Sequence, residues 1–227
     1  MTEPLEPTEG LGVLHLFFAT GPTTEAEAVR TAVKAAEEAG LQVVPFAVLG
    51  HKADLGFLAL GPDLWRLRAL QTDLVAAGLD LRDSYVSLTE LSEYSAGVPE
   101  KQKRARLHPQ LPPEGMTAFC FYPMTKRREP EQNWYELPYD DRLELMYEHG
   151  KTGRTFSGRV LQLVTGSVGL DDFEWGVSLF GVHPDDLKAC VYTMRYDRAS
   201  ARYAEFGPFT TGLIAPLDDV LRSVGLA

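Results

Sequence analysis

Hydrophobic and polar positions along the chain predict the same order of strands and helices twice. In the first half, the run GVLHLFFAT at residues 12–20 is β-branched and aromatic, as strands are. Apolar positions at helical spacing follow between Ala28 and Ala36. The elements predicted for this half are a strand at 12–20, a helix capped by Thr23 or Thr24 and ending at Gly40, strands at 41–49 and 53–60, a helix from Pro62 to near Gly78, and a strand at 84–94.

The second half repeats the order, with strands at 117–123, 159–168, 173–182 and 206–213 and helices at 139–149 and 184–194. The order β-α-β-β-α-β is the ferredoxin-like arrangement. The predicted fold class is therefore α+β, with two ferredoxin-like halves whose sheets pair into a subunit of the dimeric α+β barrel type. The predicted domain organisation is a disordered tail at 1–10, an N-terminal half at 11–95, a linker at 96–115 and a C-terminal half at 116–227.

Composition narrows the functional class. The chain has 227 residues, and its 44% hydrophobic and 24% charged content is ordinary for a soluble globular protein. A formal net charge of −10 argues against nucleic acid and anionic membranes as partners. Cys120 and Cys190 each lie in an apolar run, which suits a reducing compartment. No run reaches the roughly 18 apolar residues of a membrane span, and the N-terminus lacks the pattern of a signal peptide, so we expect a cytoplasmic protein.

Basic residues are concentrated in one part of this acidic chain, which leaves an anionic small molecule as a possible ligand. Between residues 101 and 128 the sequence places Lys101, Lys103, Arg104, Arg106, Lys126, Arg127 and Arg128.

His149 is the strongest candidate for a metal ligand. It follows Met146 by three residues on the helix face that also carries Tyr139 and Leu143, so the imidazole is expected to point inward. Spacing alone favours a core histidine bonded to a carbonyl. No second His, Cys or carboxylate stands at ligand spacing, which argues against a site built from several protein ligands. Heme needs only one or two protein ligands, so a solitary inward histidine is compatible with it.

Taken one at a time, the other candidates favour structural roles. Tyr122 suits a barrel-rim aromatic, Lys126 a solvated loop and Trp134 loop packing, while Arg195 and Ser200 flank a helix end and suit capping.

Together, several ordered segments resemble one family. YPMTKRR, NWYELP, MYEHGKTGR, TGSVGLDDFEWGVSLF, VYTMRYD and SARYAEFGPF, with GHKADLGFLALG in the first half, are similar to the coproheme decarboxylases of the chlorite dismutase-like superfamily. The resemblance covers essentially the whole chain. It implies a homopentamer of two-half subunits with the tetrapyrrole in the C-terminal half. It also implies that hydrogen peroxide drives the decarboxylation of two propionates of iron coproporphyrin III, through a three-propionate intermediate, to heme b.

The resemblance also implies residue roles. His149 matches the proximal iron ligand, Tyr122 the redox tyrosine and Lys126 the catalytic residue that assists at a propionate. The other matched positions would hold the tetrapyrrole, with Gln162 on the distal side of the iron: Arg106, Met124, Trp134, Gln162, Arg195 and Ser200.

Several alternatives stay open. Glu174 and Glu205 are candidates for the group that orients His149, as are a carbonyl or water. Iron coproporphyrin III would be both substrate and redox centre, heme b the product, and ferrochelatase a transient partner. The rivals are a chlorite dismutase or peroxidase-type enzyme, in whose branch an arginine stands where Gln162 lies here, and a non-catalytic heme-binding or heme-transfer protein.

Overall fold

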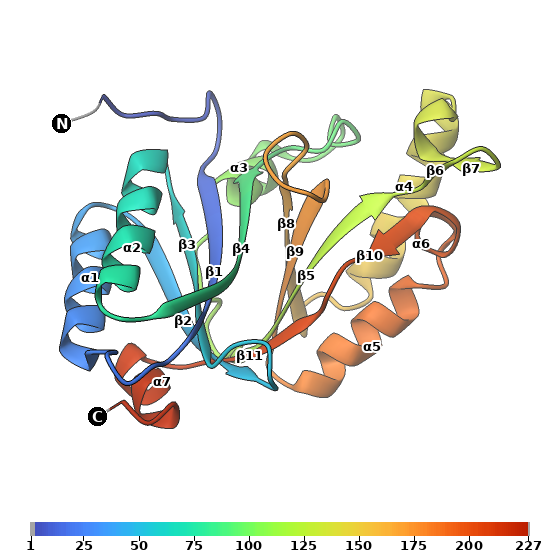
Figure 1. Ribbon diagram of the computed structural model, residues 1–227. Helices are drawn as coiled ribbons and strands as arrows, with labels where there is room; N and C mark the ends of the chain where they lie inside the picture. Colours follow the sequence, from blue (N-terminus) through green and yellow to red (C-terminus); the bar gives the residue numbers. More distant parts are fainter. Residues whose placement is uncertain (1–2, 227) are drawn as a thin grey trace.

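The chain folds into a single barrel to which two similar halves contribute. The computed structural model describes residues 3–226 (Figure 1). The N-half comprises β1 (Gly12–Ala19), α1 (Ala26–Glu38), β2 (Gln42–Leu49), β3 (Leu55–Gly61), α2 (Leu64–Ala76) and β4 (Asp80–Thr89). The C-half repeats the order with β5 (Ala118–Lys126), α4 (Tyr139–Arg154), β8 (Val160–Gly166), β9 (Trp175–Gly181), α5 (Pro184–Met194) and β11 (Thr210–Ile214).

Shorter elements fill the connections. They are α3 (Glu100–Leu107) between the halves, the β6–β7 hairpin (Arg128–Glu129 and Gln132–Asn133), a 3-10 turn η1 (Trp134–Glu136), α6 (Arg198–Tyr203), β10 (Ala204–Phe206) and α7 (Leu217–Ser223).

The strand order shows how the halves join. The long sheet runs β10-β5-β11-β2-β3-β1-β4-β8-β9, and a further β5–β9 pairing closes it into a ring. Within each half the fourth strand pairs with the first, the first with the third and the third with the second, as ferredoxin-like units do. The halves join where β11 pairs with β2 and where β4 pairs with β8, both antiparallel. The predicted fold class is confirmed.

Aromatic side chains from both halves fill the barrel interior. Phe46 of β2 packs on Phe119 of β5 with ring centroids 4.6 Å apart, and Phe119 packs on Phe180 of β9 at 5.3 Å. Gly212 of β11 lies against this group, and a Cβ there would stand 2.7 Å from the Phe46 ring and 2.9 Å from the Phe119 ring. Glycine is therefore required where the two halves meet.

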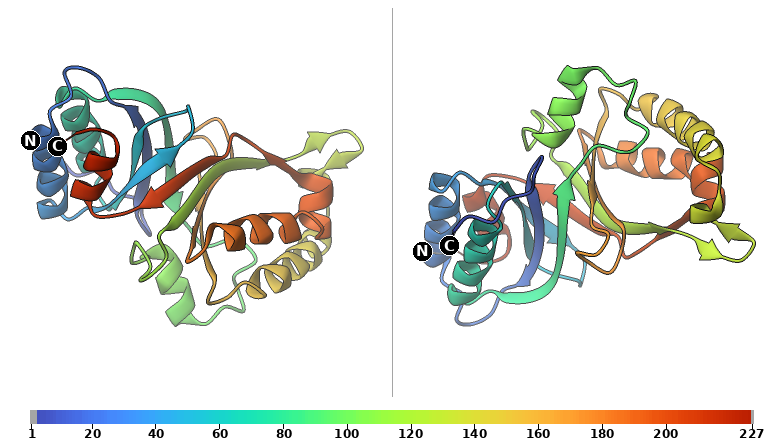
Figure 2. Two further views of the ribbon diagram at one scale, coloured as in Figure 1. Left: turned by 90° about the horizontal axis from the view of Figure 1, so that it is seen from below. Right: turned by 90° about the horizontal axis from the view of Figure 1, so that it is seen from above.

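The helices cover the outer faces of the two sheets (Figures 1 and 2). α1 and α2 bury Val29, Val33, Leu67 and Leu70 against the N-half sheet, in a cluster that α7 extends. On the C-half, α5 buries Leu187 and Cys190, but none of the sixteen residues of α4 is fully buried. The C-half sheet is therefore covered less tightly than the N-half sheet. Within residues 3–226, no helix combines the length and hydrophobicity of a membrane span.

The predicted elements are found in the predicted order, with local differences. Glu25, and not Thr23 or Thr24, occupies the N-cap of α1, because the Thr24 hydroxyl donates to the Gly78 carbonyl instead. β4 spans Asp80–Thr89, four to five residues before the predicted strand at 84–94.

The last predicted strand, 206–213, is divided in two. β10 and β11 are separated by residues 207–209, where Pro208 has no N–H for a ladder and Gly207 packs against Pro123 and Phe173. The segment 96–115 predicted as a linker contains α3, and α6 and α7 were not predicted.

Part of the predicted disordered tail can also be placed. Residues 1–2 lie outside the described part of the chain, whereas the Leu5 N–H donates to Asp63 Oδ1 at the start of α2. The boundaries predicted for the domains stay predictions.

One histidine lies wholly inside the barrel. His15 of β1 is fully buried, stacks on Phe121 with ring centroids 4.0 Å apart and shares a hydrogen bond of 2.8 Å between its Nε2 and Ser178 Oγ. Burial lowers the pKa of His15 from 6.5 to about 3, against an opposing effect of the Tyr85 backbone. His15 is therefore neutral in the folded protein at any moderate pH.

We predict that burial of neutral His15 makes the free energy of unfolding decrease at acidic pH. Below pH 6.5 the unfolded chain binds a proton that the folded chain excludes until about pH 3, so the free energy of unfolding falls as pH drops through this window. The slope from this group is about 1.4 kcal/mol per pH unit. Denaturant unfolding between pH 7 and 4.5 should show this slope in the wild type and in His51→Gln, an exposed histidine. It should be absent in His15→Phe, and an equal slope in that variant would contradict the assignment.

Candidate functional site

The candidate site is built on the outer face of β5. Side chains of a strand alternate between its two faces. Phe119 and Phe121 point into the barrel, while Tyr122 packs outward in the cluster that includes Leu187 and Cys190 of α5. Met124 lies against the same outward cluster. Tyr122, Met124 and Lys126 therefore share one face, toward the helix layer.

β8 contributes a second wall. Val160 packs in the outward cluster, so Gln162 and Val164, two and four residues on, point the same way. Gln162 Nε2 donates to Cys190 Sγ at 3.5 Å. Val164 is 46% exposed even though it faces the helix side of the sheet. Because Val164 is apolar and lies on the face of the sheet toward α4, its exposure indicates unfilled space between β8 and α4.

α4 crosses this space without packing onto the sheet. Its main neighbours are α5 and α6 and not the strands, as its position beside α5 in Figure 2 illustrates. Gly153 in its last turn lies near β8 and α5, and an added Cβ there would stand 3.5 Å from Gln162 Nε2 and 3.8 Å from Met194 Cε. His149 stands one helical turn before Gly153, on the side that faces the sheet.

The His149 imidazole is held through one nitrogen. Its Nδ1 lies 3.1 Å from Asp197 Oδ2 and 3.4 Å from Ser200 Oγ, and within residues 3–226 its Nε2 has no hydrogen-bond partner. Asp197 caps α6, where its Oδ1 accepts from the Ser200 N–H at 2.9 Å. Burial acts to raise the pKa of Asp197, but its bonds with His149 and Ser200 outweigh this and lower it. An ionised Asp197 therefore orients a half-exposed imidazole whose Nε2 is open.

Neither glutamate proposed to orient His149 does so. Glu174 Oε2 accepts from the Lys126 backbone N–H at 2.8 Å, and Glu205 lies 3.6 Å from Arg127 Nε. The correct partner, Asp197, is 48 residues from His149 and sits at the start of an unpredicted helix. Asp is a preferred N-cap residue, so Asp197 before the run RASARY was the local signal available for such a helix.

Tyr122 is a buried phenol in an aromatic surround. It is 8% exposed, stacks on Phe209 with ring centroids 4.5 Å apart and meets Phe206 edge-on at 5.6 Å. Burial raises the pKa of Tyr122 above its ordinary value, although the nearby Arg195 guanidinium acts to lower it. The phenol therefore keeps its proton at physiological pH.

Lys126 is a buried ammonium next to an aromatic ring. Its Nζ lies 4.4 Å from the Trp134 ring centroid and 3.4 Å from the Ala199 carbonyl oxygen. The side chain is 7% exposed. Burial lowers the pKa of Lys126 to about 8, against the opposing effects of Asp197 and Glu174. Lys126 can therefore exchange a proton near physiological pH.

The remaining predicted residues lie around this centre. Trp134 is buried against Tyr203, Ser200 is bonded to Asp197, and the guanidinium of the exposed Arg195 lies 5.3 Å from the Phe206 ring centroid. Arg106 is exposed on α3, where its Nη1 donates to Ser95 Oγ at 3.4 Å. The structure thus brings the predicted C-half residues together on one side of the sheet, with Arg106 on a separate element.

The two arginines after Lys126 are engaged elsewhere. Arg127 donates to Gln132 Oε1 at 2.8 Å, and Arg128 is paired with Glu174. Only the first cation of the Lys-Arg-Arg run therefore points into the site.

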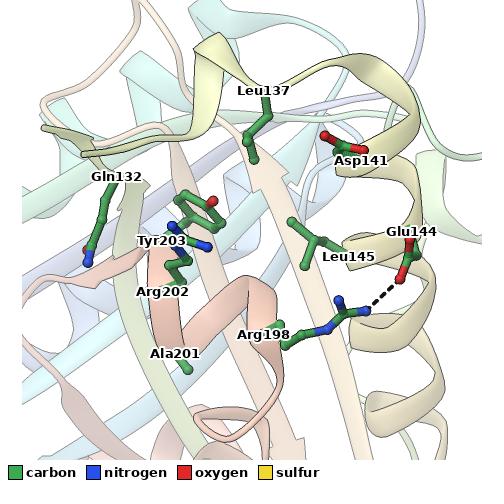
Figure 3. A pocket seen from close by; sticks show the side chains of 9 residues that line it. All are labelled: Gln132, Leu137, Asp141, Glu144, Leu145, Arg198, Ala201, Arg202 and Tyr203. Carbon is green, nitrogen blue, oxygen red and sulfur yellow. Dashed lines mark hydrogen bonds and ion pairs between the residues drawn. The ribbon is translucent and has the colours of Figure 1, made fainter. Parts of the chain in front are cut away.

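A cavity of about 680 Å³ lies next to this site, between α4, α6 and the β6–β7 hairpin (Figure 3). It is lined by Gln132, Leu137, Asp141, Glu144, Leu145, Arg198, Ala201, Arg202 and Tyr203. None of the predicted site residues lines it, so it is a neighbouring feature, separate from the predicted site.

The arrangement fits an iron tetrapyrrole. An oriented imidazole with an open Nε2, apolar Val164 and a neutral Gln162 face a loosely filled layer, and Lys126 and Arg195 supply positive charge at its margin. Within residues 3–226, no group of three or more His, Cys, Asp or Glu side chains has the geometry of a metal site. His149 is thus the residue that would bind the iron, and Lys126 and Arg195 would face its carboxylates.

Comparisons with known proteins agree with this chemistry. The model of the chlorite dismutase family matches residues 23–215. The coproheme decarboxylase of Staphylococcus saprophyticus is 39% identical over 97% of this chain and 98% of its own length. A candidate heme-binding protein of Natronomonas pharaonis is 41% identical over 79% of this chain, and the match spans only 32% of that longer protein.

The solved structure of a heme-binding protein from Thermus thermophilus is similar over 100% of both chains, with 37% identity and a TM-score of 0.87. These comparisons confirm the resemblance inferred from the sequence motifs.

We predict that Lys126 titrates near pH 8 and that Glu174 helps to keep its pKa from falling further. Side-chain Nζ NMR should show one lysine with a midpoint near 8 that disappears in Lys126→Met. Glu174→Gln should lower this midpoint, because it removes a carboxylate that favours the ammonium form. Glu205→Gln, which removes a carboxylate paired with Arg127, is the matched control and should leave it unchanged. The absence of any lysine titrating below pH 9 would contradict the prediction.

Proposed function

This chain belongs to the chlorite dismutase family, and we propose that it is a coproheme decarboxylase. Its substrate would be iron coproporphyrin III, its oxidant hydrogen peroxide and its product heme b, reached through a three-propionate intermediate. One observation carries the proposal: Tyr122, Met124 and Lys126 share the face of β5 that looks toward the helix bearing His149. Assembly as a homopentamer, contact with ferrochelatase and a cytoplasmic location belong to the proposal through the resemblance alone.

His149 would hold the iron through Nε2. Because Asp197 accepts from Nδ1, the tautomer with Nε2 unprotonated is favoured, which is the form that binds a metal. The carboxylate also increases the basicity of the ligand. Asp197 is 4% exposed, so its charge acts on the imidazole with little screening by solvent.

Cations would fix the rotation of the macrocycle. Four propionates make the substrate strongly anionic. Charge-assisted hydrogen bonds from Lys126 and Arg195 to propionates on two sides of the ring would hold it in one orientation. Ser200 would offer a hydroxyl next to His149, and Arg106 would reach the ring from α3. The rotation matters because it decides which propionate lies beside the buried phenol of Tyr122.

Tyr122 and Lys126 would carry the chemistry on the propionate. When bound, the iron porphyrin supplies the centre at which peroxide is reduced. Each propionate plus one peroxide and one proton gives a vinyl group, carbon dioxide and two waters. Tyr122 enters this reaction protonated, since burial raises the pKa of its phenol, and so it can give up an electron together with its proton. Lys126, with a pKa of about 8, is able to accept or return a proton beside the reacting carboxylate.

Gln162 supports this function over chlorite chemistry. In the chlorite dismutase branch an arginine stands at the corresponding position, whereas Gln162 is uncharged and bonded to Cys190. A neutral amide leaves room for peroxide without adding a cation there. A non-catalytic heme carrier shares the imidazole site but has no need of a buried phenol next to a lysine of lowered pKa.

We predict that Tyr122→Phe binds iron coproporphyrin III as the wild type does but fails to decarboxylate it. The ring and its aromatic packing are kept, and only the transferable hydrogen of the phenol is lost. Titration of the complexes with peroxide, followed by mass spectrometry of the porphyrin, should show loss of two carbon dioxide units in the wild type and at least a hundredfold slower loss in the variant.

Two control variants test the phenol and the iron ligand, and two outcomes with the wild type separate the rival functions. Tyr147→Phe removes an exposed phenol from α4 and should leave turnover unchanged. His149→Ala should lose the axial ligand and change the Soret spectrum of the bound porphyrin. Intact coproporphyrin after peroxide addition to the wild type would favour a carrier, and rapid oxygen release from chlorite would favour the dismutase activity.

A further inference from the structure

We propose that Arg198 is a positioning residue for the iron ligand: it fastens α6 to α4 and thereby keeps Asp197 within hydrogen-bonding distance of His149. The inference rests on the proposed function, because its consequence appears in the properties of an iron bound to His149. Arg198 touches neither the imidazole nor the expected position of the substrate, and it acts only through the two helices.

The N-cap residue and the first residue of α6 contact two adjacent residues of α4. Asp197 bonds to His149, and Arg198 bonds to Glu148, through Nε to Oε2 at 2.7 Å and through its backbone N–H to Oε1 at 3.1 Å. The other branch of the guanidinium reaches Glu144, one turn earlier, with Nη2 to Oε1 at 2.8 Å (Figure 3). The planar fork of Arg198 thus connects two turns of α4 to the first turn of α6.

Side-chain packing holds these helices together only weakly. No residue of α4 is fully buried, and only Leu145 and Met146 of this helix reach the small cluster around Tyr203. The 680 Å³ cavity opens between α4 and α6 next to Arg198, so apolar contact is missing where the two helices would otherwise interlock (Figure 3). The ion pairs of Arg198 span the edge of this cavity.

A displacement of α6 along α4 would lengthen the bond between Asp197 and His149, which has a length of 3.1 Å and tolerates little extension. Loss of that bond makes the imidazole a weaker donor to iron.

A purely structural ion pair would behave differently in experiments. The Arg198 side chain is 58% exposed, and exposed pairs contribute little to stability. We therefore expect Arg198→Ala to fold and to unfold at nearly the wild-type temperature. Its effect should appear in the iron–histidine bond, which a pair of merely structural importance would not alter.

The test uses the full chain loaded with iron coproporphyrin III. In Arg198→Ala the ferrous iron–histidine stretching frequency should fall and the iron reduction potential should rise, both toward the values of Asp197→Asn. Turnover with peroxide should fall about tenfold, which is the smaller end of the range of losses seen when a residue that orients a metal ligand is removed. Arg198→Lys should lie between wild type and alanine, because an ammonium cannot bind both glutamates in the same fork.

Two variants control the measurement. Arg202→Ala removes a guanidinium from the same helix and the same cavity wall, and within residues 3–226 Arg202 forms no ion pair with α4, so it should leave frequency and potential unchanged. Glu148→Gln removes the other half of the contact and should shift both quantities in the same direction as Arg198→Ala.

The possible failures are distinguishable. Unchanged frequency and potential in Arg198→Ala, or an equal shift in Arg202→Ala, would overturn the role of Arg198 alone. If the wild type does not bind iron coproporphyrin III through His149, the proposed function fails, and this inference fails with it.

Discussion

The two-residue alternation of the barrel strands is the constraint on which the molecule depends. On β5, Phe119 and Phe121 enter the shared interior, and Tyr122, Met124 and Lys126 must then point outward. Any slip of one residue would exchange the two sets, placing a lysine in the aromatic interior and phenylalanines in the site. The pairings of β5 with both β9 and β11 fix this register, so the same hydrogen bonds that close the barrel also define the site.

The two halves use similar elements for different purposes. In the N-half, α1 and α2 press apolar side chains onto their sheet and leave no room for a ligand. In the C-half, α5 does the same at one end, while α4 stands away from the strands and is held by α6 through polar contacts. Because α4 is held at its side by α6 and buries none of its own residues, the space between α4 and the sheet is left open to a ligand. This difference explains why one of two related units carries the polar site and the other serves as a scaffold.

Much of this architecture was predictable because it follows from local patterns. Alternating and helical periods located the main strands and helices, and the helical period predicted that His149 points inward. The strand predicted at 117–123 stops before Lys126, which the sequence pattern put in a solvated loop and which is in fact buried at the end of β5. The site roles of Tyr122 and Lys126 came from the family resemblance. What escaped prediction is either short or non-local. α6 has six residues and no apolar stripe, and Asp197 meets His149 only through tertiary contact. The partners of Arg127 and Arg128 depend on how β9 and β10 lie beside β5, which no local pattern encodes.

The shared barrel also has a consequence for how the molecule can be divided. β2 has β11 of the other half as a neighbour, and β4 has β8, so each half supplies the strand that covers the other's edges. A C-half severed at α3 would carry the histidine, the phenol and the lysine, yet it would present two bare backbone edges and a row of unsheltered phenylalanines. Such a fragment is prone to self-association. The C-half therefore needs the N-half to pair its strand edges and to cover its phenylalanines, even though the N-half provides almost none of the reactive groups.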